Sequence, residues 1–129
     1  MRLDKYSVTL TGDSDTETIN GGSPVFAKLV KIEIKNSATA QPSDNWDLEV
    51  FTGTASGNDD ESLFLDGTVS NSKTTKVVYY PVTPAAKAAD GSASSLTEVS
   101  PIANGVVTVS GTNMGASNTA VVTLIFEAA

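Results

Sequence analysis

The stretch Val30-Lys31-Ile32-Glu33-Ile34-Lys35 decides the fold class of this chain. Apolar and charged residues alternate in it with a period of two, which is the pattern of a β-strand that has one buried and one solvated face. The alternation extends back toward Phe26, so the sequence predicts a strand from Phe26 to Lys35 that buries Val30 and the two isoleucines. An amphipathic helix would instead repeat its apolar residues every three to four positions.

Similar short runs recur along the whole chain, and β-branched and aromatic residues dominate them, as a half-buried sheet favours. The further predicted strands are Tyr6–Leu10, Trp46–Val50, Ser62–Leu65, Thr74–Tyr80, Gly105–Ser110 and Ala120–Phe126. Turn-forming segments such as Asn20–Pro24 separate them. Seven or eight such strands predict an all-β fold, an antiparallel two-sheet β-sandwich of jelly-roll type. Trp46 lies on the apolar face of its run and is expected in the core.

Length and composition indicate one binding or structural domain. A chain of 129 residues has the size of an ordinary domain, so residues 1–129 are expected to form a single β-sandwich. The sequence contains neither histidine nor cysteine, the residues that most often carry acid–base, nucleophilic and metal chemistry. A nucleophilic serine would also need a base beside it. We therefore expect no enzymatic activity, no catalytic residue and no cofactor.

The charge distribution argues against two kinds of partner. The chain has a net charge of −7, and its eight basic residues are scattered. Nucleic-acid binding usually requires a basic stripe, and anionic membranes attract clustered cations, so neither partner is expected. No run approaches the roughly 20 apolar residues of a membrane span. The first residues lack the apolar segment of a signal peptide, which predicts synthesis in the cytoplasm.

Two acidic clusters raise the question of calcium. Asp13-Ser14-Asp15-Thr16-Glu17 has carboxylates at alternate positions, as in the first half of an EF-hand loop. The match fails afterwards, because Thr18 stands in place of the glycine and Pro24 in place of the bidentate glutamate. Asp59-Asp60-Glu61 forms the second cluster. We expect no metal site and interpret both loops as solvated turns, and whether they bind Ca²⁺ stays open.

Two segments without a strand pattern are the candidate partner contacts, because such segments can become ordered against a partner. They are the first six residues and part of the long excursion from Pro81 to Pro101, whose stretch Pro84–Gly91 could form a single helical turn. The candidate contact residues are Met1, Arg2, Leu3, Asp4, Lys5, Tyr6, Pro84, Ala85, Ala86, Lys87 and Leu96.

The C-terminal half resembles a known group of proteins. Val77-Val78-Tyr79-Tyr80-Pro81 ends a strand in a Tyr-Pro pair, and Pro101-Ile102-Ala103-Asn104 leads into the valine-rich stretch Val106–Val109 and a final strand, Thr119–Glu127. This order is similar to that of the capsid decoration, or cement, proteins of tailed bacteriophages and related β-sandwich minor virion proteins. The sequence differs from the pattern of this group in two places. Val82 stands where its members often have arginine, and Gly105-Val106 where they often have a charged pair.

The resemblance implies a virion structural protein that decorates or cements a phage capsid on its exterior. The implied partner is the assembled lattice of the major capsid protein, and the implied oligomer is a homotrimer. Two alternatives stay open at this point, a head-fibre or tail component and a carbohydrate-binding module. The carbohydrate-binding module predicts at least two exposed aromatic residues on one face, for which Trp46, Tyr79 and Tyr80 are the candidates.

Overall fold

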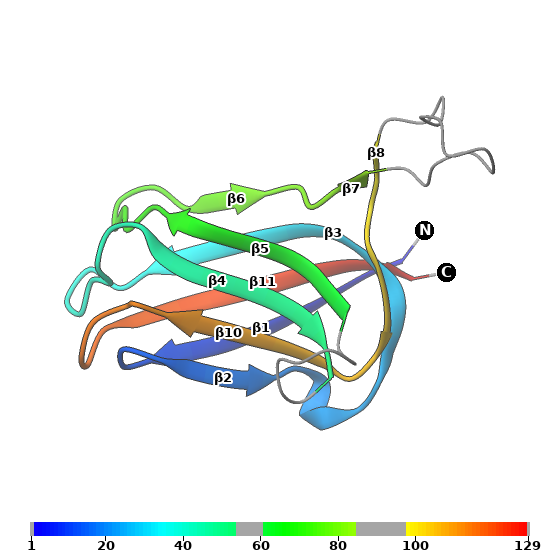
Figure 1. The fold of residues 1–129 in the computed structure, drawn as a ribbon, viewed down its shortest axis with the longest axis horizontal. Helices are drawn as coiled ribbons and strands as arrows, with labels where there is room; N and C mark the ends of the chain where they lie inside the picture. The colour runs from blue at the N-terminus through cyan, green and yellow to red at the C-terminus, as the bar shows by residue number, and fades with distance from the viewer. Residues whose placement is uncertain (1, 54–60, 85–97, 129) are drawn as a thin grey trace.

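The computed structural model describes residues 2–53, 61–84 and 98–128, which form two antiparallel sheets packed face to face (Figure 1). The strands are β1 (Leu3–Thr11), β2 (Asp15–Thr18), β3 (Val25–Asn36), β4 (Trp46–Thr52), β5 (Glu61–Val69), β6 (Val77–Tyr79), β7 (Thr83–Pro84), β8 (Glu98–Val99), β9 (Ile102–Gly105), β10 (Val107–Thr112) and β11 (Thr119–Ala128). A short 3-10 turn, η1 (Asn20–Gly22), precedes β3. The prediction of an all-β antiparallel sandwich is confirmed.

The strand order is that of a jelly roll. Sheet A runs β1-β11-β3-β6, with β9 also paired to β3, and sheet B runs β2-β10-β4-β5. The first four strands alternate between the sheets, and the last two return to the middle, β10 between β2 and β4 and β11 between β1 and β3. The sheets have five and four strands, against the seven or eight predicted in total, and β7 and β8 form a separate pair.

The extra strand arises because the position beside β3 is occupied twice. β9 pairs with the start of β3, from Val25 to Lys28, and β6 pairs with its later part, from Ile32 to Ile34. The excursion between residues 80 and 101 separates these two short strands in the sequence. One predicted strand position is therefore filled by two segments.

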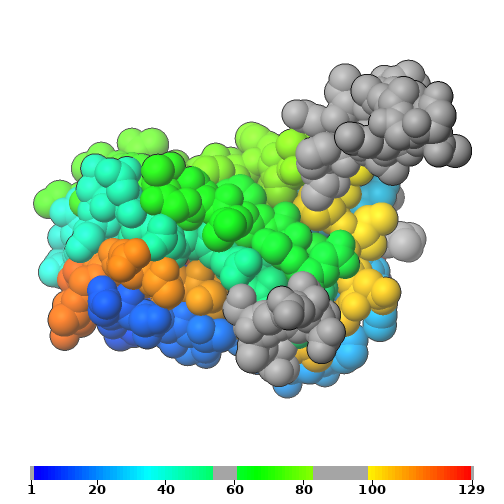
Figure 2. Space-filling model, viewed as in Figure 1, coloured from blue at the N-terminus to red at the C-terminus, as the bar shows by residue number. Residues whose placement is uncertain are grey.

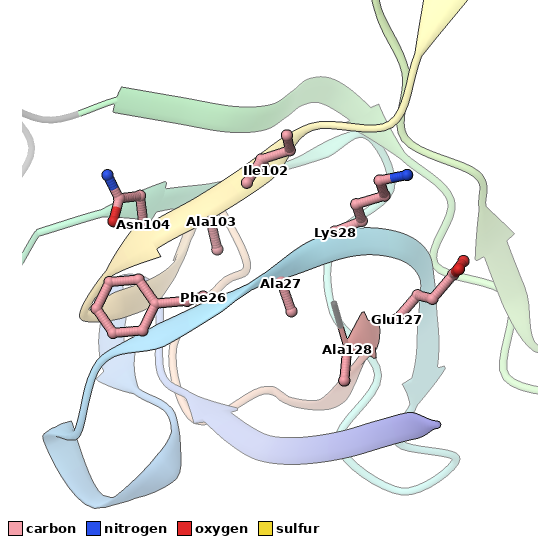
Figure 3. A pocket seen from close by; sticks show the side chains of 8 residues that line it. All are labelled: Phe26, Ala27, Lys28, Ile102, Ala103, Asn104, Glu127 and Ala128. Carbon is pink, nitrogen blue, oxygen red and sulfur yellow. The ribbon is translucent and has the colours of Figure 1, made fainter. Parts of the chain in front are cut away.

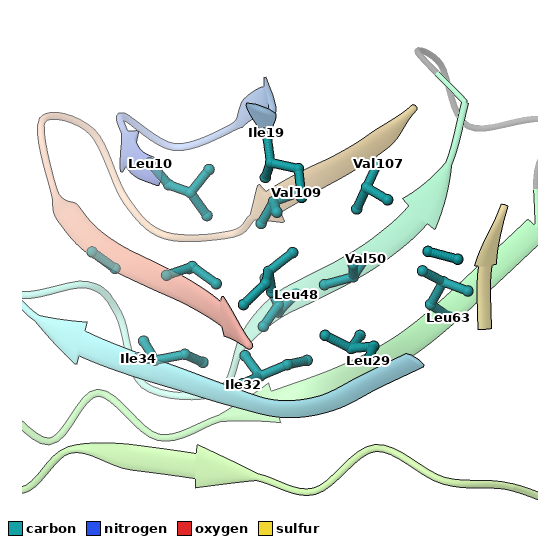
Figure 4. Packing of buried hydrophobic residues seen from close by; sticks show 14 of the residues in the cluster. Leu10, Ile19, Leu29, Ile32, Ile34, Leu48, Val50, Leu63, Val107 and Val109 are labelled. Atoms are coloured by element: carbon teal, nitrogen blue, oxygen red, sulfur yellow. The ribbon is translucent and has the colours of Figure 1, made fainter. Parts of the chain in front are cut away.

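The core lies between the two sheets, and the longer strands contribute alternate apolar side chains to it (Figure 4). Trp46 is fully buried there, as predicted. The other fully buried large side chains are Phe126, Leu10, Ile19, Leu29, Ile32, Ile34, Leu48, Met114, Leu124, Val50 and Val69. Their apolar surface removed from water supplies the main stabilisation of the fold.

A β-bulge in β3 corrects the predicted inner face of this strand. Ile125 of β11 lies opposite Lys31 and Phe126 opposite Leu29, so Val30 has no partner in the register. The extra residue shifts the alternation by one position. Residues 25, 27 and 29 point inward before the bulge, and Ile32 and Ile34 do so after it, while Val30 is only half-buried. The prediction that Val30 shares the buried face with the isoleucines is wrong for this reason.

Candidate docking surface

The outer face of sheet A carries large apolar side chains in solvent. Directly opposed residues of a sheet share a face, so the register decides which side chains lie together. Phe26 opposes Asn104, and Lys28 opposes Ile102. The exposed fractions are 65% for Phe26, 58% for Ile102 and 52% for Leu3. These side chains form the apolar part of the outer face, which we refer to as the apolar patch.

A hollow of about 370 Å³ lies where β9, β3 and the end of β11 run side by side (Figure 3). Phe26 and Ile102 flank it together with Lys28 and Glu127. Each of the three strands also contributes an alanine to the lining, namely Ala103, Ala27 and Ala128. The volume falls within the range of about 300–1,000 Å³ that small binding pockets have.

The two sheets differ in charge. The strands of sheet A carry Lys5, Lys28, Lys31 and Lys35, and Lys5, Lys28 and Lys35 are exposed. None of the four strands of sheet B contains a lysine or arginine, all four being described by the structure. Those strands carry Asp15, Glu17, Asp47, Glu49, Glu61 and Asp66. Figure 2 views the molecule from the side of sheet B, so the lysine-bearing outer face of sheet A is turned away.

An ion-pair network orders the outer face of sheet A beside β6. Glu33 accepts from Lys31 at 3.1 Å and from Lys76 at 2.9 Å. The hydrogen bonds from Lys76 and Lys31 lower the pKa of the Glu33 carboxyl, and the bond to Glu33 raises the pKa of Lys31. Both groups therefore stay charged across the neutral range. The Lys31 ammonium also lies 5.9 Å from the centre of the exposed Tyr80 ring, which is within cation–π distance.

The N-terminal candidate contacts belong to a paired strand, which corrects the expectation that Met1–Tyr6 lacks strand structure. Residues 3–6 lie in β1 and pair with β11, starting at Leu3 opposite Glu127. Leu3 and Lys5 are exposed, whereas Tyr6 packs edge-on against Phe126, with ring centres 5.9 Å apart. Arg2 is exposed and holds Asp4 in an ion pair at 3.1 Å. The structure thus brings two of the candidates, Leu3 and Lys5, onto the outer face of sheet A.

The remaining candidates give less information. Pro84 lies in β7, paired with β8. Met1, Ala85, Ala86, Lys87 and Leu96 lie outside the described residues, as does most of the helical turn predicted for Pro84–Gly91. The sequence also missed Phe26 as a surface residue. The alternation of Val25, Ala27 and Leu29 could have indicated its exposure, because it places Phe26 on the opposite face of the strand.

The carboxylates of the first acidic cluster hold turns together. One oxygen of Asp13 accepts from the backbone N–H of Gly115 at 2.9 Å. The two oxygens of Asp15 accept from the N–H groups of Thr11 and Thr16 at 2.9 and 2.8 Å. Within residues 2–53, 61–84 and 98–128 no group of three or more acidic residues is placed to hold a metal ion. Asp59 and Asp60 are outside the described part, and Glu61 starts β5.

The three aromatic residues considered for sugar binding do not form a platform. Trp46 is in the core, and the hydroxyl of Tyr79 donates to Asp66. Tyr80 alone of the three is largely exposed, at 69%. The described segments also hold no helix of the length and apolar character that crossing a membrane requires.

Comparison with known proteins adds little to this picture. No family model matches the chain, and no curated protein matches it. Among solved structures, a chain from the structure of infectious bursal disease virus, Gx strain, aligns with 97% of this chain at 9% identity and a TM-score of 0.39. The alignment covers 35% of that viral chain, and a likeness of this degree does not bear on function. The fold and the outer face of sheet A define the protein as a jelly-roll β-sandwich domain with a one-sided exposed apolar patch.

Proposed function

We propose that this protein is a virion structural component that decorates or cements a bacteriophage capsid by binding the assembled lattice of the major capsid protein. The observation that carries the proposal is the apolar patch of Phe26, Ile102 and Leu3 on one face of a sandwich whose other sheet is acidic. Several large exposed apolar side chains on one face of a soluble protein mark an interaction surface. The resemblance of the segment from Val77 to Glu127 to decoration proteins supports the choice of partner.

The fold supports this proposal only in general terms. Jelly rolls serve as viral capsid domains and also as lectins and cupins, so the fold by itself does not select a function. The surface is more informative, since it favours binding over catalysis. In this proposal the outer face of sheet A binds the partner. The outer face of sheet B is acidic and rich in hydroxyl groups, and such a surface favours the solubility of an abundant domain.

The proposed role follows from linkage between binding and assembly. A site composed of several neighbouring capsid subunits exists only after the shell has formed. A ligand that binds the assembled state alone shifts the equilibrium toward that state. Repetition over a symmetric lattice, and a homotrimer bridging neighbouring capsomers, would multiply weak contacts by avidity.

The test uses undecorated shells and free major capsid protein from the virus that carries the gene. The purified chain is expected to co-sediment with shells, to leave the free subunit unbound, and to raise the temperature at which the shells open. If the shells open at the same temperature with and without saturating protein, the cement role is excluded. If no protein co-sediments, decoration is excluded as well.

A further inference from the structure

We propose that the outer face of sheet A, centred on the hollow between β9, β3 and β11, docks onto an acidic protein surface that projects an apolar side chain into the hollow. The inference rests on the proposed function and names the binding surface of this protein and the chemistry of its partner. Three observations carry it: the position of the exposed apolar residues, the segregation of charge and the shape of the hollow.

Five of the eight exposed large apolar side chains of the described residues lie on one face of the molecule. The register places Leu3, Phe26, Ile102 and Val78 on the outer face of sheet A, opposite Glu127, Asn104, Lys28 and Glu33. Exposed Tyr80 joins this face through its contact with Lys31. On the strands of sheet B, Leu65 is the one large apolar side chain of the described residues that is exposed. Single exposed residues need no explanation, whereas a cluster on one face marks a docking surface.

The charges beside the patch indicate which charge the partner surface carries. Lys28 and Glu127 both line the hollow, and Lys5 is exposed on β1 beside β11, so the lysines next to the patch outnumber the carboxylates. Cations around an apolar centre complement a surface that presents carboxylates around an apolar projection. The acidic strands of sheet B then face away from the partner and repel a second negatively charged surface.

The same charges disfavour two other anionic occupants. Nucleic acids offer a continuous row of phosphates, whereas this face intersperses its lysines with Glu33 and Glu127. A second copy could place its acidic sheet B on the lysines. Because the two faces lie on opposite sides of the sandwich, that contact would leave a free face on every copy and build an open stack. The net charge of −7 opposes such a stack.

The hollow gives the contact its specificity. Its lining combines two large apolar side chains, Phe26 and Ile102, with one cation and one carboxylate. An apolar or aromatic side chain that fills such a site and is shielded from water commonly becomes the energetic centre of an interface. The surrounding lysines then contribute mainly to association rate and orientation.

The experiment measures co-sedimentation of variants with undecorated shells of the same virus. Phe26→Ser and Ile102→Ser are expected to weaken binding about tenfold or more each. The matched control is Leu65→Ser, since Leu65 is as exposed as Phe26, 69% against 65%, but lies on sheet B. Lys28→Glu is expected to weaken binding several-fold, while Glu17→Gln on sheet B leaves it unchanged, and added salt should weaken wild-type binding. Thermal melting of the free variants checks that each one folds.

The outcomes separate the two proposals. If wild-type protein binds the shells but Phe26→Ser and Ile102→Ser bind equally well, the docking surface is wrong while the decoration role stands. If wild-type protein does not bind, the decoration role fails and the docking surface fails with it. If sedimentation velocity of the chain alone shows oligomers that Phe26→Ser abolishes, the occupant is a second copy and the acidic partner is overturned. Hydrogen exchange of the shell-bound protein should protect β9 and the start of β3, and protection confined to β4 and β5 would contradict the inference.

Discussion

The hydroxyl of Tyr79 on β6 donates a 2.5 Å hydrogen bond to Oδ2 of Asp66 on β5, and this bond joins the edge of sheet A to the edge of sheet B. The ring of Phe64 lies against that of Tyr79, with centres 4.7 Å apart. The other oxygen of Asp66 accepts from the N–H and the hydroxyl of Thr68 at 2.9 and 2.8 Å. One carboxylate therefore links the two sheets where the described edge strands β5 and β6 belong to different sheets and share no ladder.

Replacing Tyr79 by phenylalanine should destabilise the protein by about 1–2 kcal/mol, because hydrogen bonds to charged groups contribute more than neutral ones. Urea unfolding measures the change. Tyr6→Phe is the control, since Tyr6 is also half-buried against an aromatic ring but lies on β1. A double-mutant cycle with Asp66→Asn should give a coupling near the full effect of Tyr79→Phe. A coupling near zero would show that the bond does not hold the sheets together.

The same pair should make stability depend on pH at both extremes. Burial and the bond to Asp66 raise the pKa of Tyr79 above its ordinary 10.0, so the unfolded chain loses this proton first and stability falls as pH rises above 10.0. Burial acts against ionisation of Asp66, but the bonds from Tyr79 and Thr68 outweigh it and lower its pKa below 3.8. Stability is then lost as pH falls below 3.8 through the folded-state pKa. The difference in unfolding free energy between wild type and Tyr79→Phe should be constant between about pH 5 and 9 and shrink on either side. A difference that stays constant at both extremes would disprove this assignment.

The bulge in β3 predicts unequal effects for two residues that look equivalent in the sequence. Ile32→Ala should cost about 2–5 kcal/mol, as is usual for a fully buried side chain. Val30→Ala should cost about 1 kcal/mol or less, because Val30 is half-buried at the bulge. Chemical denaturation of both variants gives the comparison. Equal losses would mean that β3 runs without a bulge.

Gly111 should not tolerate a methyl group. A Cβ at this position would lie 2.8 Å from the sulfur of Met114, 2.9 Å from Leu10 and 3.3 Å from Trp46, all of them buried. Gly111→Ala should therefore destabilise by about 1–3 kcal/mol through overpacking. Gly67→Ala is the control, because its Cβ would meet only the Asp47 carboxylate at 3.0 Å. Thermal melting with similar losses for both variants would argue against close packing around Gly111.

Asp13 should stabilise the fold by hydrogen bonding and not by metal binding. Its bond to the N–H of Gly115 ties the β1–β2 turn to the β10–β11 loop. Asp13→Ala should cost about 1 kcal/mol. Addition of EDTA should leave the melting temperature of both wild type and variant unchanged. A fall in wild-type melting temperature that is absent in the variant would identify Asp13 as a metal ligand.

The sequence predicted the strands that alternate cleanly and failed where alternation is interrupted. Trp46 and the strands around it followed from the period of two, because burial on one face requires that pattern. The bulge at Val30 left no mark in the sequence, since valine suits either face. The start of β1 was missed because Leu3 and Lys5 point outward while Asp4 and Tyr6 point inward, so its apolar residues do not share a face.

The docking surface could not be predicted because it depends on which strands lie side by side. Leu3, Phe26 and Ile102 come from three strands that are far apart in the sequence. Alternation shows that a residue points away from the core, but it does not show which other residues share that face. The segregation of lysines onto sheet A was also hidden, since successive strands alternate between the two sheets along the chain.

The central positions of the last two strands have a consequence for synthesis. β1 and β3 are joined only through β11, and β2 and β4 only through β10. While a ribosome is still producing residues before Val107, β3 can pair with β6 and β9 and β4 with β5, but β1 and β2 have no strand to pair with and neither sheet can be completed. The native fold can form only after nearly the whole chain has emerged. Such late, non-local pairing is slow and exposes nascent chains to aggregation, so both sheets of this domain should be completed only after β11 has been synthesised.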